Sequence, residues 1–232
     1  KIAADTQGTQ IVVNDSKTPS GRVHVGSLRG VIIHDVIYRA LKRAGKSARF
    51  LYGADDYDAL DAVPHYLDLE KFSPYLGFPL CNVPSPGNHS SDYAKYFMGE
   101  FLEVFDHLGV RPETYYLRDF YRSGQFNAHI DRFLQNAHLV REAYLQVSKA
   151  ERPENWYPFQ VICENCGKIA TTVVTDYNDK EVFYTCKPDA TEYTQGCGHS
   201  GWISPFDGNG KLPWKVEWVA KWDLLGVTIE MA

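Results

Sequence analysis

The chain has 232 residues, of which 44% are hydrophobic and 23% are charged. This length suits one large domain, or one domain that carries a sizeable insertion. The net charge is −5, so we expect any RNA contact to be local or to lie outside this chain, because self-sufficient nucleic-acid-binding proteins are usually basic. No apolar run is long enough for a membrane span and there is no signal-peptide pattern, so we do not expect a membrane protein. The odd number of cysteines, five, favours a cytoplasmic location over a disulfide-bonded secreted protein.

Three segments near the N-terminal end predict a β-α-β unit. The β-branched run QIVV at 10–13 suits a buried parallel strand. From Ile33 to Ala44 apolar residues recur every three or four positions, which predicts an amphipathic helix that ends near Gly45. The run ARFLY at 48–52 has the composition of a second strand. This order predicts an α/β fold with a Rossmann-like parallel sheet.

Helices are expected next along the chain, followed by a segment of short β-like pieces. A helix capped by Ser90 or Ser91 would have an apolar face made of Ala94, Phe97, Met98, Phe101, Leu102, Phe105 and Leu108. The segment 123–148 is expected to continue as a long helical stretch up to about Ser148, and ERPENWYPF at 151–159 as a linker. Short β-like pieces fill 161–202, and helix and strand return from Trp214. We expect the first half of the sheet with its helical segment at 1–158, an insertion at 159–204 and the start of the second half at 205–232.

The segment KTPSGRVHVGSLRG at 17–30 lies where the first strand leads into the helix. Glycines at such a turn let the backbone approach a phosphate, and the helix start offers free N–H groups. A dinucleotide fingerprint needs a further glycine between Gly21 and Gly26, and a P-loop needs a lysine where Ser27 stands. Both of these nucleotide sites are therefore excluded.

The residues His24-Val25-Gly26-Ser27 resemble the H-I-G-H element of class I aminoacyl-tRNA synthetases. A histidine at a helix start can donate to phosphate oxygens that gain charge when a carboxylate attacks the α-phosphate. Gly26 would leave room for adenine and ribose against the backbone. Taken alone, these four residues also fit a plain strand-to-helix turn with a surface histidine.

Longer matches resemble one family within this class, the class I lysyl-tRNA synthetases. The matching blocks are TPSGRVHVGSLRG, DDYDALDAVP, PENWYPF and WKVEWVAKWDLLGV, in the family's order, and they cover most of the chain from about residue 10. The resemblance implies an enzyme that activates L-lysine with ATP and Mg²⁺ to lysyl-adenylate and transfers the lysine to tRNA(Lys). Two alternatives stay open: a class I synthetase for another amino acid or another HxGH nucleotidylyltransferase, and a non-catalytic truncated relative that binds tRNA or protein.

The resemblance also implies roles for individual residues. Catalysis would involve His24 and Ser27, and ATP would contact Thr18, Pro19, Gly21, His24, Gly26 and Ser27. The lysine substrate would contact Thr18, Asp55, Asp56, Asp58, Trp218 and Trp222. A lysine ammonium needs a carboxylate partner, and among the three aspartates we favour Asp56. The alternatives are a solvated acidic loop for the aspartates and plain core packing for the tryptophans.

Four of the five cysteines lie within 35 residues, which favours a metal site over a disulfide scaffold. We expect Cys163, Cys166, Cys186 and Cys197 to bind a structural zinc ion, with His199 as the substitute for one of them. A redox CxxC motif is the alternative, but the thioredoxin-like context is missing.

The sequence contains no K-M-S-K-S-type lysine loop, the second signature of class I synthetases. The family would continue past GVTIEMA into the rest of the sheet, this loop and a helical anticodon-binding domain. We therefore expect a fragment whose tRNA contacts lie mainly in regions absent from it. These residues alone would be poor catalysts, because much of the transition-state stabilisation would be missing.

Overall fold

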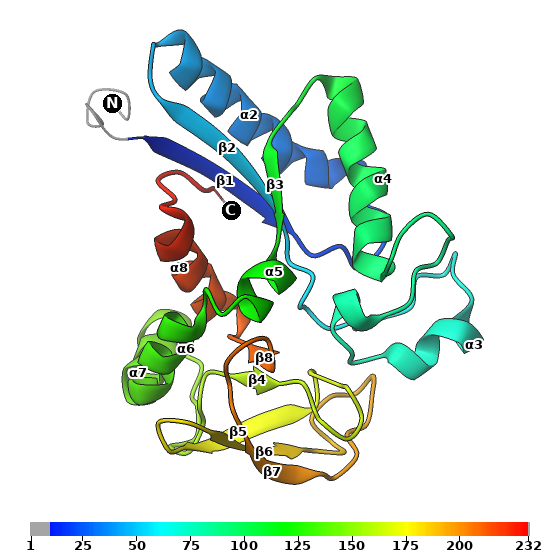
Figure 1. Ribbon diagram of the computed structural model, residues 1–232, viewed down its shortest axis with the longest axis vertical. Coiled ribbons are helices and arrows are strands. Elements are labelled where there is room, and N and C mark those ends of the chain that lie inside the picture. The colour runs from blue at the N-terminus through cyan, green and yellow to red at the C-terminus, as the bar shows by residue number, and fades with distance from the viewer. Residues whose placement is uncertain (1–9, 232) are drawn as a thin grey trace.

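The computed structural model describes residues 10–231. Its upper body in Figure 1 is built on a three-stranded parallel sheet in the order β1-β2-β3. The strands are β1 (Ile11–Lys17), β2 (Ala48–Ala54) and β3 (Glu113–Tyr116). Helix α2 (Leu28–Arg43) connects β1 to β2, and helix α4 (Tyr93–Leu108) lies between β2 and β3. Because the strands are parallel, their carboxyl ends meet at one edge, where open α/β sheets bind ligands.

The predicted β-α-β unit is confirmed. Residues 11–14 of β1 are all buried, as expected for a strand covered on both faces. Helix α2 begins before the predicted start at Ile33, and Gly45 follows its end with a φ of 71°. Helices α2 and α4 pack on the same face of the sheet, because their buried side chains share one apolar cluster with β1 and β2.

Three expectations about the helices were wrong. Helix α4 is capped by Asp92 rather than by Ser90 or Ser91, and its carboxylate accepts the Lys95 N–H at 3.0 Å. Leu108 at the end of this helix is 47% exposed, so it does not share the buried face. The expected long helix at 123–148 is instead two helices, because the backbone of Asn136 leaves the helical region (φ −110°, ψ 31°). These helices are α6 (Asn127–Gln135) and α7 (Ala137–Ser148), and the shorter α5 (Leu117–Arg122) precedes them.

The segment between β2 and α4 contains only short turns of helix. These are α3 (Leu69–Phe72) and two 3₁₀ turns, η2 (Ser73–Tyr75) and η3 (Leu80–Asn82). Their apolar side chains form a separate cluster with the first turns of α4, which includes Leu60, Phe72, Leu80 and Phe97. This packing fixes the segment 55–92 beside the carboxyl edge of the sheet.

The cysteine-bearing part forms the lower body in Figure 1, and its β-like pieces are confirmed as strands. An antiparallel sheet joins β5 (Thr172–Tyr177), β6 (Val182–Cys186) and β7 (Ser200–Ile203). Where the chain enters and leaves this part, β4 (Gln160–Val161) pairs with β8 (Gly210–Lys211). The exact domain boundaries at 158 and 204 stay a prediction, and residues 1–9 and 232 lie outside the described part.

The C-terminal segment returns to the parallel sheet. Helix α8 (Trp214–Leu225) is followed by a parallel bridge between Ile229 and Val13 of β1. Asn14 donates its backbone N–H to the Ile229 carbonyl at 2.9 Å. Between residues 10 and 231, no helix has both the length and the apolar character needed to cross a membrane.

Candidate active site

The loop after β1 carries the predicted nucleotide signature and ends in the 3₁₀ turn η1 (Val25–Ser27), which leads into α2. His24 caps this turn, and its Nδ1 atom accepts the Gly26 N–H at 3.1 Å. A neutral imidazole that accepts through Nδ1 carries its proton on Nε2. Since His24 is exposed, this second nitrogen is available as a donor at the start of a 16-residue helix.

Two glycines of the signature are required by close contacts. A Cβ atom on Gly26 would lie 2.9 Å from the ring of His24, so a side chain there would displace the histidine. A Cβ atom on Gly30 would lie 2.9 Å from a carboxylate oxygen of Asp15, because the first turn of α2 runs close to β1. Gly26 therefore sets the position of the His24 ring as well as leaving space for a ligand.

Two cavities adjoin the loop and share Lys17 and Ser27 in their walls. The first has a volume of about 410 Å³ and is lined by Lys17, Thr18, Ser20, Gly21, Arg22, Val23, His24, Ser27, Asp61, Ala62, Pro64 and Tyr66. The second has a volume of about 250 Å³ and includes Gly26, Ser27 and Gly30. Five of the predicted ATP residues thus line these cavities, whereas Pro19 is buried and lines neither.

Sequence reasoning missed one wall of the first cavity. Asp61, Ala62, Pro64 and Tyr66 come from the segment after β2, not from the signature loop. Asp61, Ala62 and Pro64 belong to the block DDYDALDAVP, which the sequence marked only as a match to the family, and Tyr66 follows this block by two residues. The cavity is therefore built from two segments that are about 40 residues apart in the chain.

Asp55, at the end of β2, is paired with a cation from α8. Its carboxylate lies 3.2 Å from Lys221 Nζ and accepts a hydrogen bond from Ser16 Oγ at 3.0 Å. Lys221 Nζ also donates to Ser16 Oγ at 2.8 Å. Both charged side chains are almost fully buried, so this carboxylate is already neutralised by the chain itself.

Asp56, the aspartate favoured by the sequence for the substrate ammonium, is fully buried. Its two carboxylate oxygens accept from the backbone N–H and the guanidinium of Arg118, which also forms two bonds to Asp92 at 2.7 and 2.8 Å. Burial raises the pKa of Asp56 to about 6, although the charge of Arg118 opposes the shift. These contacts argue against Asp56 as the ammonium partner, because they leave it no face toward a ligand.

Asp58 is the most accessible of the three aspartates, with 22% of its side chain exposed. It forms an ion pair with Lys211, which also lies 3.2 Å from Glu217 of α8. Its other oxygen accepts from Thr18 Oγ1 at 2.5 Å. Since Thr18 lines the larger cavity, Asp58 is the one of these three predicted aspartates that lies next to a residue of its wall.

Trp218 and Trp222 form an aromatic row on α8 together with Trp214. The Trp218 ring stacks on Trp214 with centroids 5.6 Å apart and meets Trp222 edge-on at 5.2 Å. The indole N–H of Trp222 donates to Glu230 at 2.6 Å. Among the described contacts, neither ring touches the three aspartates, so their role toward lysine stays a prediction.

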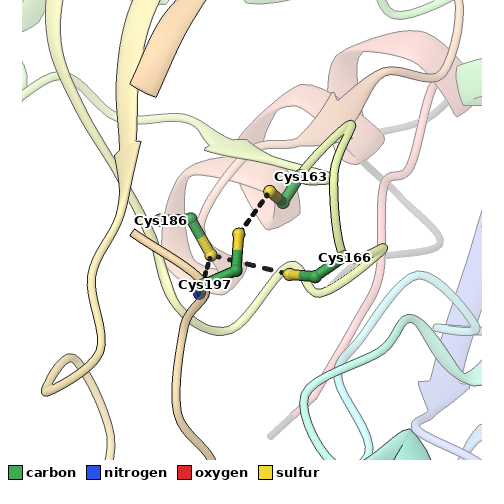
Figure 2. A group of neighbouring side chains, drawn as sticks. All are labelled: Cys163, Cys166, Cys186 and Cys197. Atoms are coloured by element: carbon green, nitrogen blue, oxygen red, sulfur yellow. Dashed lines mark hydrogen bonds between the residues drawn. The ribbon is translucent and has the colours of Figure 1, made fainter. Parts of the chain in front are cut away.

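The four predicted cysteines converge on one point, as Figure 2 shows. Their Sγ atoms all lie within 4.8 Å of one another, a donor set that can hold a metal ion. His199 is not in this group, and its ring instead lies 3.9 Å from the Glu164 carboxylate. Cys81 lies apart and bonds Asn82 at 3.6 Å.

Comparison with known proteins identifies the family. A family model described as "tRNA synthetases class I (K)" matches residues 1–232. The chain belongs to this family. It is 36% identical to the lysine–tRNA ligase of Methanococcus maripaludis over 99% of the chain and 42% of that protein. The corresponding ligase of Methanosarcina barkeri is 37% identical over 92% of the chain and 38% of its own length. That of Methanocaldococcus jannaschii is 34% identical over 99% and 42%.

This class I synthetase chain spans about two fifths of the length of the relatives it matches. The described residues nevertheless bring together the residues predicted to bind ATP and one of the aspartates predicted to bind lysine. The imidazole of His24, the start of α2 and the Thr18–Asp58 pair lie around one carboxyl edge of the parallel sheet. Such an arrangement can bind an anionic phosphate chain beside a cationic side chain.

Proposed function

We propose that this chain is the part of a class I lysyl-tRNA synthetase that binds ATP and L-lysine. The whole enzyme would activate L-lysine with ATP and Mg²⁺ to lysyl-adenylate and then transfer the lysine to tRNA(Lys). The relatives named lysine–tRNA ligase support this substrate class. The observation that carries the proposal is His24, which is oriented by the Gly26 N–H and lines a cavity at the start of α2.

In this reaction the lysine carboxylate is the nucleophile, so no side chain of the protein has to act as one. The carboxylate oxygen attacks the α-phosphorus, the bond to the bridging oxygen breaks, and pyrophosphate leaves. Negative charge builds on the α-phosphate oxygens in the transition state. The Nε2–H of His24 and the free N–H groups at the helix start would stabilise that charge. Mg²⁺, when bound with ATP, would neutralise charge on the phosphates.

For the amino acid, we propose Asp58 in place of Asp56 as the carboxylate that attracts the lysine ammonium. Asp58 is partly exposed and bonds Thr18 at the wall of the larger cavity. Trp218 and Trp222 are proposed to form an aromatic wall, since a cation against an aromatic face gains about 0.5–2 kcal/mol.

The cysteine cluster is proposed to hold one structural Zn²⁺ ion. With Zn–S bonds of about 2.3 Å, neighbouring sulfurs of a tetrahedral site lie about 3.8 Å apart. The Cys163–Cys197 and Cys166–Cys186 sulfur distances are 3.6 and 3.7 Å. The donor set and spacing therefore fit this metal. The ion would cross-link β6 with the loops at 163–166 and 197 and would take no part in the reaction.

Contacts with tRNA are proposed to involve mainly regions that the relatives have and this chain does not cover. The net charge of −5 supports this division, because a surface for the phosphate backbone would be basic. The residues described here would then deliver the activated lysine rather than select the tRNA.

The proposal is tested by measuring the melting temperature of the chain with L-lysine, with ATP and Mg²⁺, and with neither. A ligand at 100 times its Kd stabilises the folded state by about 2.7 kcal/mol, which gives a clear shift. We expect shifts with both ligands, and His24→Ala should abolish or strongly reduce the ATP shift. His107→Ala, on an exposed part of α4, is the matched control and should behave as the wild type. The lysine assignment would be contradicted if ATP shifted the melting temperature but L-lysine did not, or if another amino acid shifted it instead.

A further inference from the structure

Tyr66 lines the 410 Å³ cavity together with His24, although it comes from the segment after β2. Its hydroxyl oxygen accepts the backbone N–H of Arg22 at 2.5 Å. The guanidinium of Arg22 lies over the Tyr66 ring, 5.3 Å from the centroid. On another side the ring meets Phe97 of α4 edge-on at 6.3 Å. Tyr66 thus connects the core of this segment to the middle of the signature loop.

The signature loop is held at this point by two tyrosine hydroxyls. Tyr93, which is fully buried, donates to the Ser20 carbonyl at 2.8 Å, and Tyr66 accepts from Arg22 two residues later. Gly21 lies between these two bonds, and a Cβ atom on it would come within 2.8 Å of the Tyr66 hydroxyl. The absence of a side chain at 21 therefore allows the hydroxyl to reach the backbone.

The two hydroxyls differ in how their hydrogens are used. A tyrosine hydroxyl has one hydrogen to donate and can also accept. The hydrogen of Tyr93 is bonded to Ser20. The hydroxyl of Tyr66 acts as an acceptor, and within residues 10–231 it has no bond in which it donates. This hydrogen is therefore free for an acceptor at the wall of the cavity.

The chemistry of the cavity indicates which acceptor this is. Lys17 and His24 supply donors or positive charge to its wall, and Asp61 is its one acidic residue. Arg22 also lines the cavity, with its guanidinium paired to Glu100 at 3.1 Å. Such a wall favours an anion with several oxygens, such as the phosphate chain of a nucleoside triphosphate. The lysine ammonium is proposed to lie beside Asp58, which is not among the residues that line this cavity.

We infer that Tyr66 is a further nucleotide-binding residue: its oxygen fixes the signature loop through Arg22, and its hydrogen bonds a phosphate oxygen. This inference rests on the proposed function, because it assumes ATP in this cavity. Tyr66 binds the ligand and positions the loop, and no bond to it forms or breaks in the reaction.

The test compares Tyr66→Phe with the wild-type chain by calorimetric titration with Mg-ATP, inorganic tripolyphosphate and L-lysine. We expect about tenfold weaker binding of ATP and of tripolyphosphate and unchanged binding of lysine, because a hydrogen bond to a charged group is lost. Hydrogen exchange of the Arg22 amide should also become at least several-fold faster. Tyr75→Phe is the matched control: it removes a hydroxyl from the same segment, away from the cavity, and should change none of these values.

The outcomes separate this inference from the proposed function. Wild-type affinity of Tyr66→Phe for ATP would overturn the role of Tyr66 and leave the proposed function intact. Equal weakening of ATP and lysine binding, with a lower melting temperature, would also overturn it, since that pattern indicates a purely structural role. If the wild type bound ATP but not lysine, the lysine assignment would be overturned. The role of Tyr66 would then still be decided by the ATP affinity of Tyr66→Phe. Failure of the wild type to bind either ATP or tripolyphosphate would overturn both.

Discussion

The ammonium of Lys221 lies 3.2 Å from the carboxylate of Asp55, although 166 residues separate the two in the chain. Lys221 belongs to α8, and Asp55 follows the last residue of β2. Ser16 at the end of β1 bonds both groups. This buried triangle attaches α8 to the edge of the sheet where the two cavities and the signature loop lie.

Lys221→Met is expected to lower the free energy of unfolding by about 3–5 kcal/mol, because it leaves the buried Asp55 carboxylate without its cation. Urea unfolding followed by circular dichroism measures the change. Lys42→Met, on the exposed face of α2, is the control and should stay within about 0.5 kcal/mol of the wild type. Similar effects of the two substitutions would show that the buried pair does not fix α8.

Asp92 is expected to contribute a stability that depends on pH. Burial alone would raise its pKa, but hydrogen bonds from Arg118 and Lys95 outweigh burial, so the pKa lies below its ordinary value of 3.8. The unfolded state therefore takes up a proton first as the pH falls. The stabilisation is complete above pH 3.8 and is lost as the pH falls through the lower pKa of the folded state.

Asp92→Asn should therefore destabilise the protein by about 1.5–3 kcal/mol at pH 7 and by less at pH 3, because asparagine retains the helix cap but not the charge. The measurement is the free energy of unfolding of both proteins between pH 2.5 and 7. The same difference at both ends of this range would contradict the assigned pKa. Asp106→Asn, whose ion pair with Arg111 is exposed, is the control and should have little effect.

The cysteine cluster is expected to bind one zinc ion per chain, measured by elemental analysis of the purified protein. Cys166→Ser should lose the metal and lower the melting temperature, since the small sheet of the lower body has few other cross-links. His199→Ala and Cys81→Ser should both retain it, because neither residue belongs to the four-sulfur group. Loss of zinc in His199→Ala would mean that the histidine replaces one cysteine as a ligand.

Asp58→Asn is expected to weaken L-lysine binding by about tenfold, or 1.4 kcal/mol, and to leave ATP binding nearly unchanged. The reason is that the amide of asparagine keeps a hydrogen bond to Thr18 but removes the negative charge that attracts the ammonium. Calorimetric titration of each ligand separates the two effects. A loss of ATP affinity with intact lysine affinity would assign Asp58 to the nucleotide instead.

The structural features that could be predicted from the sequence are mainly those that depend on residues close together in the chain. The strands at the N-terminal end and the β-α-β order follow from local periodicity, and the structure confirms them. The four cysteines stand out by their position within 35 residues, and their sulfur atoms lie within 4.8 Å of one another. The break at Asn136 was missed because apolar residues continue on both sides of it with helical spacing. Nothing local shows that a single asparagine interrupts the backbone, since its helix propensity is only slightly unfavourable.

The partners of the aspartates could not be predicted, because they come from distant segments. The DDYD block was recognisable as an acidic cluster, but Arg118, Lys211 and Lys221 follow it by 62, 153 and 166 residues. Only the folded chain shows that Asp56 is enclosed by Arg118 whereas Asp58 keeps an exposed edge. Tyr66 was missed for the same reason, since its contact with Arg22 spans 44 residues.

Two non-hydrolysable adenylate analogues show whether one site binds both an adenylate and a lysine side chain. One carries lysine, and the other carries norleucine, which has the same aliphatic stem but no ammonium. We predict that calorimetric titration finds at least tenfold tighter binding of the lysyl analogue, and that His24→Ala weakens the binding of both. Equal affinities for the two analogues would contradict recognition of lysine by this chain.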